Sequence, residues 1–233
     1  MRTIYNLLFI FWLLFLSNNT NAAEITLTEA QSLVREGIQR ISNTNKQQWA
    51  FELHSFESEE GDITQYSASF NGVAAKGEQW QLISWNGETA TKKQHREFIK
   101  ERENPKKSFG ITLNQLINID SVQIIDDSEK QLQVTFKVNI DELGDDANEK
   151  LLGQLTLNKT NNLIHQIEIN NISEFSPMAM TTIDSFKMVL QFNEFSEQVL
   201  LKTTELMMAG TFAGFIELNE ISKDEYKFFK KLE

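Results

Sequence analysis

The sequence of 233 residues has no cysteine, only two prolines and only three histidines. The lack of cysteine excludes disulfides, a thiolate nucleophile, cysteine-ligated zinc and cysteine-linked lipid. The scarcity of proline excludes a Pro-rich, low-complexity chain. Basic residues are also few, because 22 Lys and Arg face 33 Asp and Glu, which gives a formal net charge of -11. Such a charge argues against nucleic acid as a partner, since phosphate binding needs a basic surface.

The N-terminus has the layout of a secretory signal peptide. Arg2 precedes an unbroken apolar run, Leu7 to Leu16, and a short polar stretch then leads to Ala22. This run has about half of the roughly 20 residues that a spanning helix needs, so we expect cleavage rather than anchoring. We predict a signal peptide at residues 1–22 and one domain at 23–233. Because no later apolar run is long enough to span, and because secretion without disulfides suits a bacterial periplasm, we expect a periplasmic protein without a transmembrane segment in its mature form.

Hydrophobic periodicity in the rest of the chain predicts many strands and few helices. Helices are expected at Thr28–Ile41 (with Thr28 and Gln31 as its capping box), Thr91–Glu103 and Thr112–Ile117, and in a short C-terminal segment capped by Ser222 and Glu225. Strands are expected at residues 49–54, 65–70, 79–85, 122–125, 132–140, 151–157, 163–169, 186–192, 199–207 and 211–220.

This order of elements lacks the βαβ alternation of a parallel sheet. It favours a mainly β, α+β fold with a single curved antiparallel sheet of about ten strands, a half-barrel. The N-terminal helix and the charged helix at 91–103 are expected to pack on, or close, the concave face.

Motifs that carry catalysis or metal binding are missing from the sequence. His54, His95 and His165 lie far apart, and no His-Glu-x-x-His, Gly-x-Ser-x-Gly or P-loop pattern occurs. The acidic segment 141–149 has Asp146 where a calcium loop needs glycine, so a solvated loop is expected there. We therefore expect no enzyme, no metal and no cofactor, and a hydrolase whose site is assembled from distant residues is the third hypothesis.

One remaining feature is a local reversal of charge. Residues 92–107 contain seven cations and three anions, in a chain that is otherwise strongly acidic. This segment is either a solvated helix or a contact surface for anionic headgroups or an acidic partner. The residues that would form that surface contact are Lys92, Lys93, Arg96 and Lys100.

The second feature is an excess of methionine and phenylalanine late in the chain. Methionine fills irregular space and suits adaptable hydrophobic binding surfaces, although contiguous apolar residues also form ordinary cores. The residues that would line a cavity for a hydrophobic ligand are Phe136, Phe186, Met188, Phe192, Met208 and Phe212.

The segment from Tyr66 to Arg102 carries a recognisable pattern. It contains Tyr66 and Phe70, then Gly77-x-Gln79-Trp80-x-Leu82, then Asn86-Gly87-x-x-Ala90-Thr91, and a charged helix that ends Lys100-Glu101-Arg102. This pattern resembles a family of secreted bacterial envelope proteins of unassigned function, whose members have proline where Ala90 stands. The resemblance implies a fold similar to that of the lipoprotein carrier and receptor of the outer-membrane sorting pathway, a half-barrel with helices closing a hydrophobic cavity. It carries no catalytic residue.

Two hypotheses follow. The first is a periplasmic protein that shelters a lipid, an acyl chain or a lipidated partner in a hydrophobic cavity. The alternative is a non-catalytic envelope module with a packed core, which would use the basic helix as its contact surface.

Trp80 is predicted to be a structural anchor rather than a ligand-stacking residue. It alternates with Gln81 and shares its strand face with Leu82, so it is expected to point inward beneath the charged helix and to pack on Phe98. The same alternation places Trp85 on the solvated face.

Overall fold

The computed structural model describes residues 25–102 and 112–233, and in these residues all eleven strands belong to one antiparallel sheet. The strands are β1 (Trp49–Glu59), β2 (Asp62–Asn71), β3 (Trp80–Trp85), β4 (Glu88–Thr89), β5 (Gln123–Asp127), β6 (Gln131–Lys137), β7 (Leu151–Asn158), β8 (Leu163–Asn171), β9 (Thr181–Phe195), β10 (Gln198–Phe212) and β11 (Ile216–Lys231). The helices are α1 (Leu27–Ser42), α2 (Lys92–Arg102), α3 (Leu113–Leu116) and α4 (Gly144–Lys150), with short 3-10 turns η1 (Lys46–Gln48), η2 (Ile119–Ser121) and η3 (Asp141–Leu143).

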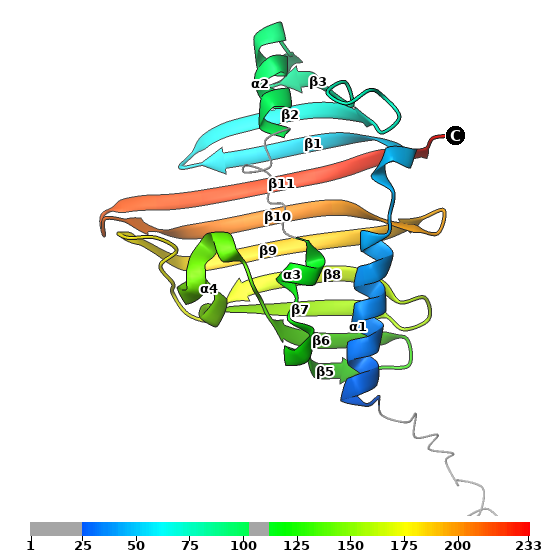
Figure 1. Cartoon of the computed structure of the whole chain (residues 1–233). Coiled ribbons are helices and arrows are strands. Elements are labelled where there is room, and N and C mark those ends of the chain that lie inside the picture. Colours follow the sequence, from blue (N-terminus) through cyan, green and yellow to red (C-terminus); the bar gives the residue numbers. More distant parts are fainter. Residues whose placement is uncertain (1–24, 103–111) are drawn as a thin grey trace, which may run out of the picture.

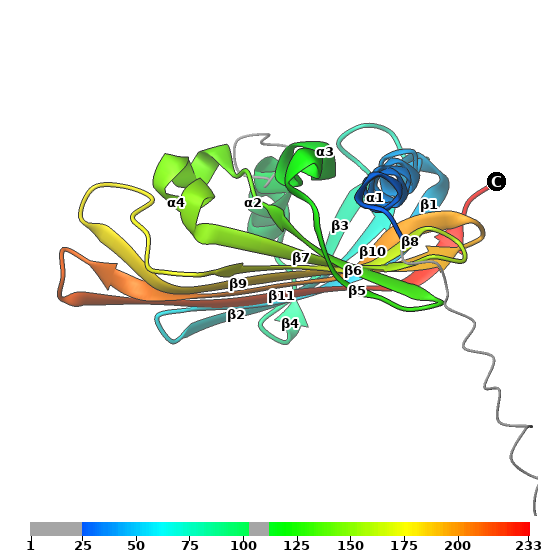
Figure 2. The same cartoon turned by 90° about the horizontal axis from the view of Figure 1, so that it is seen from below.

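The spatial order of the strands is β4-β3-β2-β1-β11-β10-β9-β8-β7-β6-β5, so the first and last strands of the chain are neighbours near the middle of the sheet (Figure 1). All four described helices lie on one side of the sheet (Figure 2). We call this side the helix face and the opposite side the outer face. The predicted fold class, a single antiparallel sheet with its helices on one face, is confirmed. None of the described helices is both long enough and apolar enough to span a bilayer.

Binary patterning of the strands explains why one face is covered. In β6, Leu132, Val134 and Phe136 are buried, and the polar residues between them point to the outer face. The neighbouring strand makes room for the Phe136 ring at Gly153, where a Cβ atom would lie 2.2 Å from the ring. Alternation of this kind is typical of an antiparallel sheet with one dry and one wet face.

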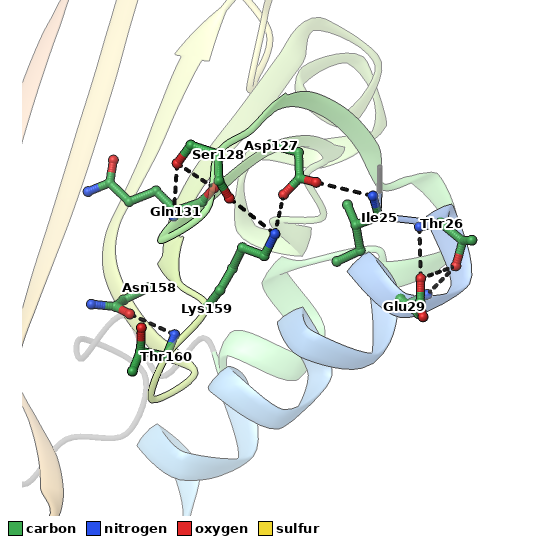
Figure 3. Close-up of polar contacts among 9 residues, drawn as sticks. All are labelled: Ile25, Thr26, Glu29, Asp127, Ser128, Gln131, Asn158, Lys159 and Thr160. Atoms are coloured by element: carbon green, nitrogen blue, oxygen red, sulfur yellow. Dashed lines mark hydrogen bonds and ion pairs between the residues drawn. The ribbon is translucent and has the colours of Figure 1, made fainter. Parts of the chain in front are cut away.

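The N-terminus of α1 is fixed to the β5–β6 edge of the sheet (Figure 3). Asp127 accepts hydrogen bonds from the Ile25 amide (3.1 Å) and from the Lys159 ammonium (2.6 Å). The helix is capped by the reciprocal pair Thr26 and Glu29. The predicted capping box of Thr28 and Gln31 is therefore wrong. Thr26 and Glu29 have the same spacing of three residues and begin the helix two residues earlier.

The C-terminal prediction is also wrong. Instead of a strand at 211–220 and a helix after it, β10 turns at Ala213 and Gly214 into β11, which continues to Lys231. Ala213 and Gly214, the first two residues of this turn, have positive φ angles. The register with β1 and β10 pairs the backbone of β11 on both edges, and this pairing overrides the helical spacing of its side chains.

The acidic segment 141–149, expected to be a loop, forms η3 and α4. Asn148 of α4 accepts a hydrogen bond from the Ile140 amide (2.8 Å), which ties the helix to the residue before η3. Lys150 forms an ion pair with Asp146 one helical turn earlier. Ala147 is buried against the sheet, which gives the short helix a reason to form. The predicted signal peptide at 1–22 lies outside the described residues.

Candidate functional site on the helix face

Two separate cores lie on the helix face. The larger core fills the space between β6–β10 and α1, α3 and α4. The smaller core lies under α2 and consists of Ala68, Leu82 and Phe98, with half-buried neighbours around them. β1 and β11 run between the two groups of helices, and no described helix crosses them there (Figure 1).

A continuous group of aromatic side chains covers the β1 and β11 seam between the cores. We call this group the aromatic band, and it consists of Trp49, Phe51, Phe70, Trp80, Phe195, Tyr226 and Phe229. Phe51 is its centre, because its ring lies 4.8 Å from the ring of Phe70 and 5.6 Å from those of Trp80, Tyr226 and Phe229. All of its members except Trp49 are half-buried. Apart from Trp80, which packs against the smaller core, the band therefore consists of apolar side chains that belong to neither core.

Strand register brings the band together. β1 and β2 place Phe51 opposite Phe70, and β1 and β11 place Leu53 opposite Tyr226. Continued alternation along β11 would next bring Phe228 to the helix face. Instead the register between β1 and β11 shifts, and Phe228 has a φ of 54° and lies exposed. This bulge turns Phe229 inward against Phe51.

Arg102 closes the band at the end of α2. Its guanidinium lies 4.9 Å from the centre of the Trp80 ring and 5.4 Å from that of Phe98, and it donates a hydrogen bond to the Tyr66 hydroxyl (2.9 Å). The guanidinium also faces Tyr226, whose pKa is raised to about 12 by burial and further by Asp224. The last turn of α2 is thus fixed to the band by cation–π contacts and hydrogen bonds.

The other end of the same seam is acidic. Glu57 and Glu59 on β1 lie beside Glu220 on β11, because the register pairs Glu59 with Glu220. Burial raises the pKa of Glu57, and the charges of Glu59 and Glu220 raise it further. Burial and Glu59 likewise raise the pKa of Glu220. Among the described residues, no set of His, Asp or Glu side chains is arranged to hold a metal ion.

The structure distributes the predicted hydrophobic-ligand residues over three environments. Phe136, Phe186, Met188 and Phe192 are buried in the larger core and contact other side chains there. Met208 is half-buried against that core, and Phe212 is exposed near the β10–β11 turn. None of the six belongs to the aromatic band.

The predicted contact surface has the exposure that is expected of a solvated helix. Lys92, Lys93, Arg96 and Lys100 are all exposed on α2. Lys93 lies 3.9 Å from Glu97 one turn later, a distance typical of a weak surface pair. Lys106 and Lys107, the rest of the basic segment, lie outside the described residues.

The predicted placement of Trp80 is confirmed, whereas its predicted role as a structural anchor rather than a ligand-stacking residue stays a prediction. The Trp80 ring lies beneath α2, 6.1 Å from Phe98 in an edge-to-face contact. The placement of Trp85 on the solvated face is wrong, because a bulge between β2 and β3 returns Trp85 to the helix face, where it stacks on Tyr66 at 5.7 Å.

Sequence reasoning missed Tyr226 and Phe229 as site residues. The sequence predicts that both lie in a short C-terminal helix capped by Ser222 and Glu225. A signal for a strand lies just before them. Lys223 and Glu225 are charged residues at alternate positions, which suits the wet face of a strand.

No protein-family model matches this sequence, and no curated protein sequence matches it. Among solved structures, a DUF1329 family protein from Desulfovibrio piger is similar with 6% sequence identity and a TM-score of 0.35, over 88% of this chain and 92% of that one. MucB in complex with MucA(peri) is similar with 8% identity and a TM-score of 0.23, over 86% of this chain and 99% of that one. A MucA/MucB complex from Pseudomonas aeruginosa gives the same identity and TM-score, over 88% and 99%. These TM-scores are too low for the likenesses to bear on function.

Proposed function

We propose that this protein binds a lipid, an acyl chain or a lipidated partner on its helix face, and that the aromatic band is the binding surface. The observation that supports the proposal is the band itself, a row of rings between the two cores. All of its members except Trp49 are half-buried, and Trp80 alone packs against one of the cores. Half-buried rings in contact with one another form a contiguous stretch of apolar surface, and such surface often marks a binding site.

The chemistry of the band favours holding a flexible apolar chain. Burial of apolar surface contributes about 25 cal/mol per Å², so one acyl chain laid along several rings gains useful affinity. Rings that meet edge to face, as Phe51 does with Trp80 and Tyr226, leave both faces and edges for contact. The proposed role is non-enzymatic, because rings bind a chain without transferring any group.

The proposed location is the periplasm. The support for it is the signal-peptide layout of residues 1–22 and the absence of cysteine from the whole sequence. A secreted carrier would hold the apolar part of its ligand away from water between membranes.

Tryptophan fluorescence gives a direct test of binding. Trp49 and Trp80 belong to the band, and Trp85 stacks on Tyr66 beside it. A fatty acid brominated along its chain quenches tryptophan only at short range. We expect titration at micromolar concentrations to quench the emission in a saturable manner, whereas the unbrominated fatty acid should not.

Matched variants locate the binding site. Phe51→Ala removes the centre of the band, and Phe56→Ala removes a half-buried ring from the opposite face of the same strand. We expect the first variant to weaken quenching about tenfold and the second to leave it unchanged. If neither fatty acid nor solvent-extracted lipid is found with the pure protein, or if both variants bind equally, the band is not the site.

The alternative role, an envelope module that uses α2 as its contact surface, is supported by the exposure of all four predicted cations. Reversal of Lys92, Lys93, Arg96 and Lys100 to glutamate should then abolish capture of an acidic partner without changing fatty-acid quenching. Unchanged capture would count against the basic helix.

A further inference from the structure

A cluster of exposed apolar side chains lies at the far end of the sheet from the aromatic band. Phe215, Met180 and Met178 are 78%, 66% and 65% exposed, and Phe212 and Ile216 beside them are also exposed. They lie on two connections, the β8–β9 loop (172–180) and the β10–β11 turn (213–215), at the left of Figures 1 and 2. We call these five residues the apolar tip.

The two connections are held together, so the tip is a built feature. The Ala213 amide donates to the Met180 carbonyl at 2.7 Å, and Thr181 pairs with Phe212 in the β9–β10 register. A shallow hollow of about 560 Å³ lies between them, bordered by Met178, Met180 and Gly214 among others.

The base of the β8–β9 loop is anchored just before the exposed methionines. Phe175 is buried and pairs with Ile183, and the Ser176 amide donates to the Asp146 carboxylate of α4 at 2.7 Å. Met178 and Met180 are therefore exposed on a loop in which Phe175 already occupies the core.

We propose that the apolar tip docks the protein on the surface of a zwitterionic lipid bilayer. This inference goes beyond the proposed function and does not rest on it, since the tip and the aromatic band share no residue. Phe215, Met180 and Met178 would enter the interface between headgroups and acyl chains, where apolar side chains gain free energy by leaving water.

The shape of the tip favours a bilayer over a folded protein partner. A standard protein interface uses about 20–30 residues on each side, whereas the tip offers five exposed apolar side chains on two connections that project at one end of the sheet (Figure 2). A fluid bilayer can surround a projection of this kind, and a rigid protein surface would need a matching pocket.

The charges around the tip select the type of bilayer. Segments 172–184 and 210–218 contain three acidic residues, Glu174, Asp184 and Glu217, and no basic one. All three acidic residues are exposed. An anionic surface would repel them, and a zwitterionic surface carries no net charge to do so.

Vesicle co-sedimentation tests the inference, with the processed chain purified from the periplasm of an expressing bacterium so that all forms share one N-terminus. The tip variant is Met180→Ser with Phe215→Ser. The matched control is Phe228→Ser, because Phe228 is 72% exposed and lies outside the tip. We expect binding to phosphatidylcholine vesicles by the wild type and the control, and about tenfold weaker binding by the tip variant.

The lipid dependence supplies the second criterion. Replacing about a third of the phosphatidylcholine with phosphatidylglycerol should weaken binding of the wild type, because the tip lacks cations. The inference is overturned if the wild type does not bind phosphatidylcholine, if the control loses as much binding as the tip variant, or if phosphatidylglycerol strengthens binding. It is also overturned if light scattering shows that the tip variant loses only self-association, because the tip would then join two copies of the chain.

Discussion

The two cores of the helix face differ in size, and the difference shows which part of that face no described helix covers. The larger core draws buried side chains from β6–β10 and from three helices, whereas the smaller one has three buried residues under α2. The strands between them, β1 and β11, have aromatic side chains but no described helix to cover them. Where helices cover the sheet the side chains build stability, and where no described helix lies over it we propose that the same kind of side chain binds a ligand.

The largest expected effect lies in the larger core. Phe136 is 1% exposed and packs over Gly153. Phe136→Ala should lower the free energy of unfolding by about 3–5 kcal/mol, since it removes a ring and leaves a cavity. Urea unfolding followed by circular dichroism measures this. Phe215→Ala, at an exposed position, should change it by less than about 0.5 kcal/mol, and a similar loss in both variants would break the comparison.

A smaller loss is expected in the smaller core. Trp80 is half-buried beneath α2, so Trp80→Ala should cost about 2 kcal/mol, below the range for fully buried tryptophan. Trp80→Phe should be tolerated, because it keeps a ring against Phe98. We expect amide exchange to accelerate mainly in α2 and β3, which would show that this core opens on its own. Uniform acceleration across β6–β10 would contradict two separate cores.

The anchor of α1 should contribute less again. Accepting a hydrogen bond from Lys159, and a second from the Ile25 amide, lowers the pKa of Asp127. The folded-state value lies below the unfolded value of about 3.9, so the stabilisation is fully present above that pH and disappears as the pH falls through the folded-state pKa. Asp127→Asn should therefore cost about 1 kcal/mol at pH 7 and nothing at strongly acidic pH. A loss independent of pH would mean that the charge is not the cause.

The smallest change in the free energy of unfolding, an increase rather than a loss, is expected at the acidic end of the seam. Burial and the neighbouring carboxylates raise the pKa of Glu57. Its favourable contribution is present below the unfolded pKa of about 4.3 and is lost as the pH rises through the folded-state value, so ionised Glu57 opposes folding. Glu57→Gln should stabilise the protein by roughly 0.5 kcal/mol at neutral pH, after allowance for screening. Glu217→Gln, which removes the same charge from an exposed site, should have no such effect.

Local patterns were sufficient for most of the chain before residue 211. Alternation in β6 and helical spacing in α1 follow directly from which side chains must be buried, so both elements are predictable. The β10–β11 turn was not, because Ala213 and Gly214 lie within an apolar run that looks continuous. The helix predicted at residues 222–229 is wrong for another reason, since a strand with a bulge at Phe228 has spacing that resembles a helix.

The binding surface was harder to predict than the fold because it depends on distant pairing. Phe51 and Phe70 lie on consecutive strands, β1 and β2, and their shared face follows from alternation. Their contact with Tyr226 and Phe229 requires the knowledge that the last strand lies beside the first, which no local pattern contains. The methionine and phenylalanine residues that the composition favoured for a ligand cavity, such as Phe186 and Met188, are instead buried in the larger core.

The position of β11 also determines the order in which the chain can fold. β1–β4 form a meander that joins the rest of the sheet only through β11, whose residues 216–231 follow those of all the other described strands in the sequence. Until β11 arrives, β1 and β10 each present an unpaired edge, which invites pairing with other chains. We expect slow folding limited by this long-range closure, and a need for protection during synthesis that a sheet with sequential strand order would not have.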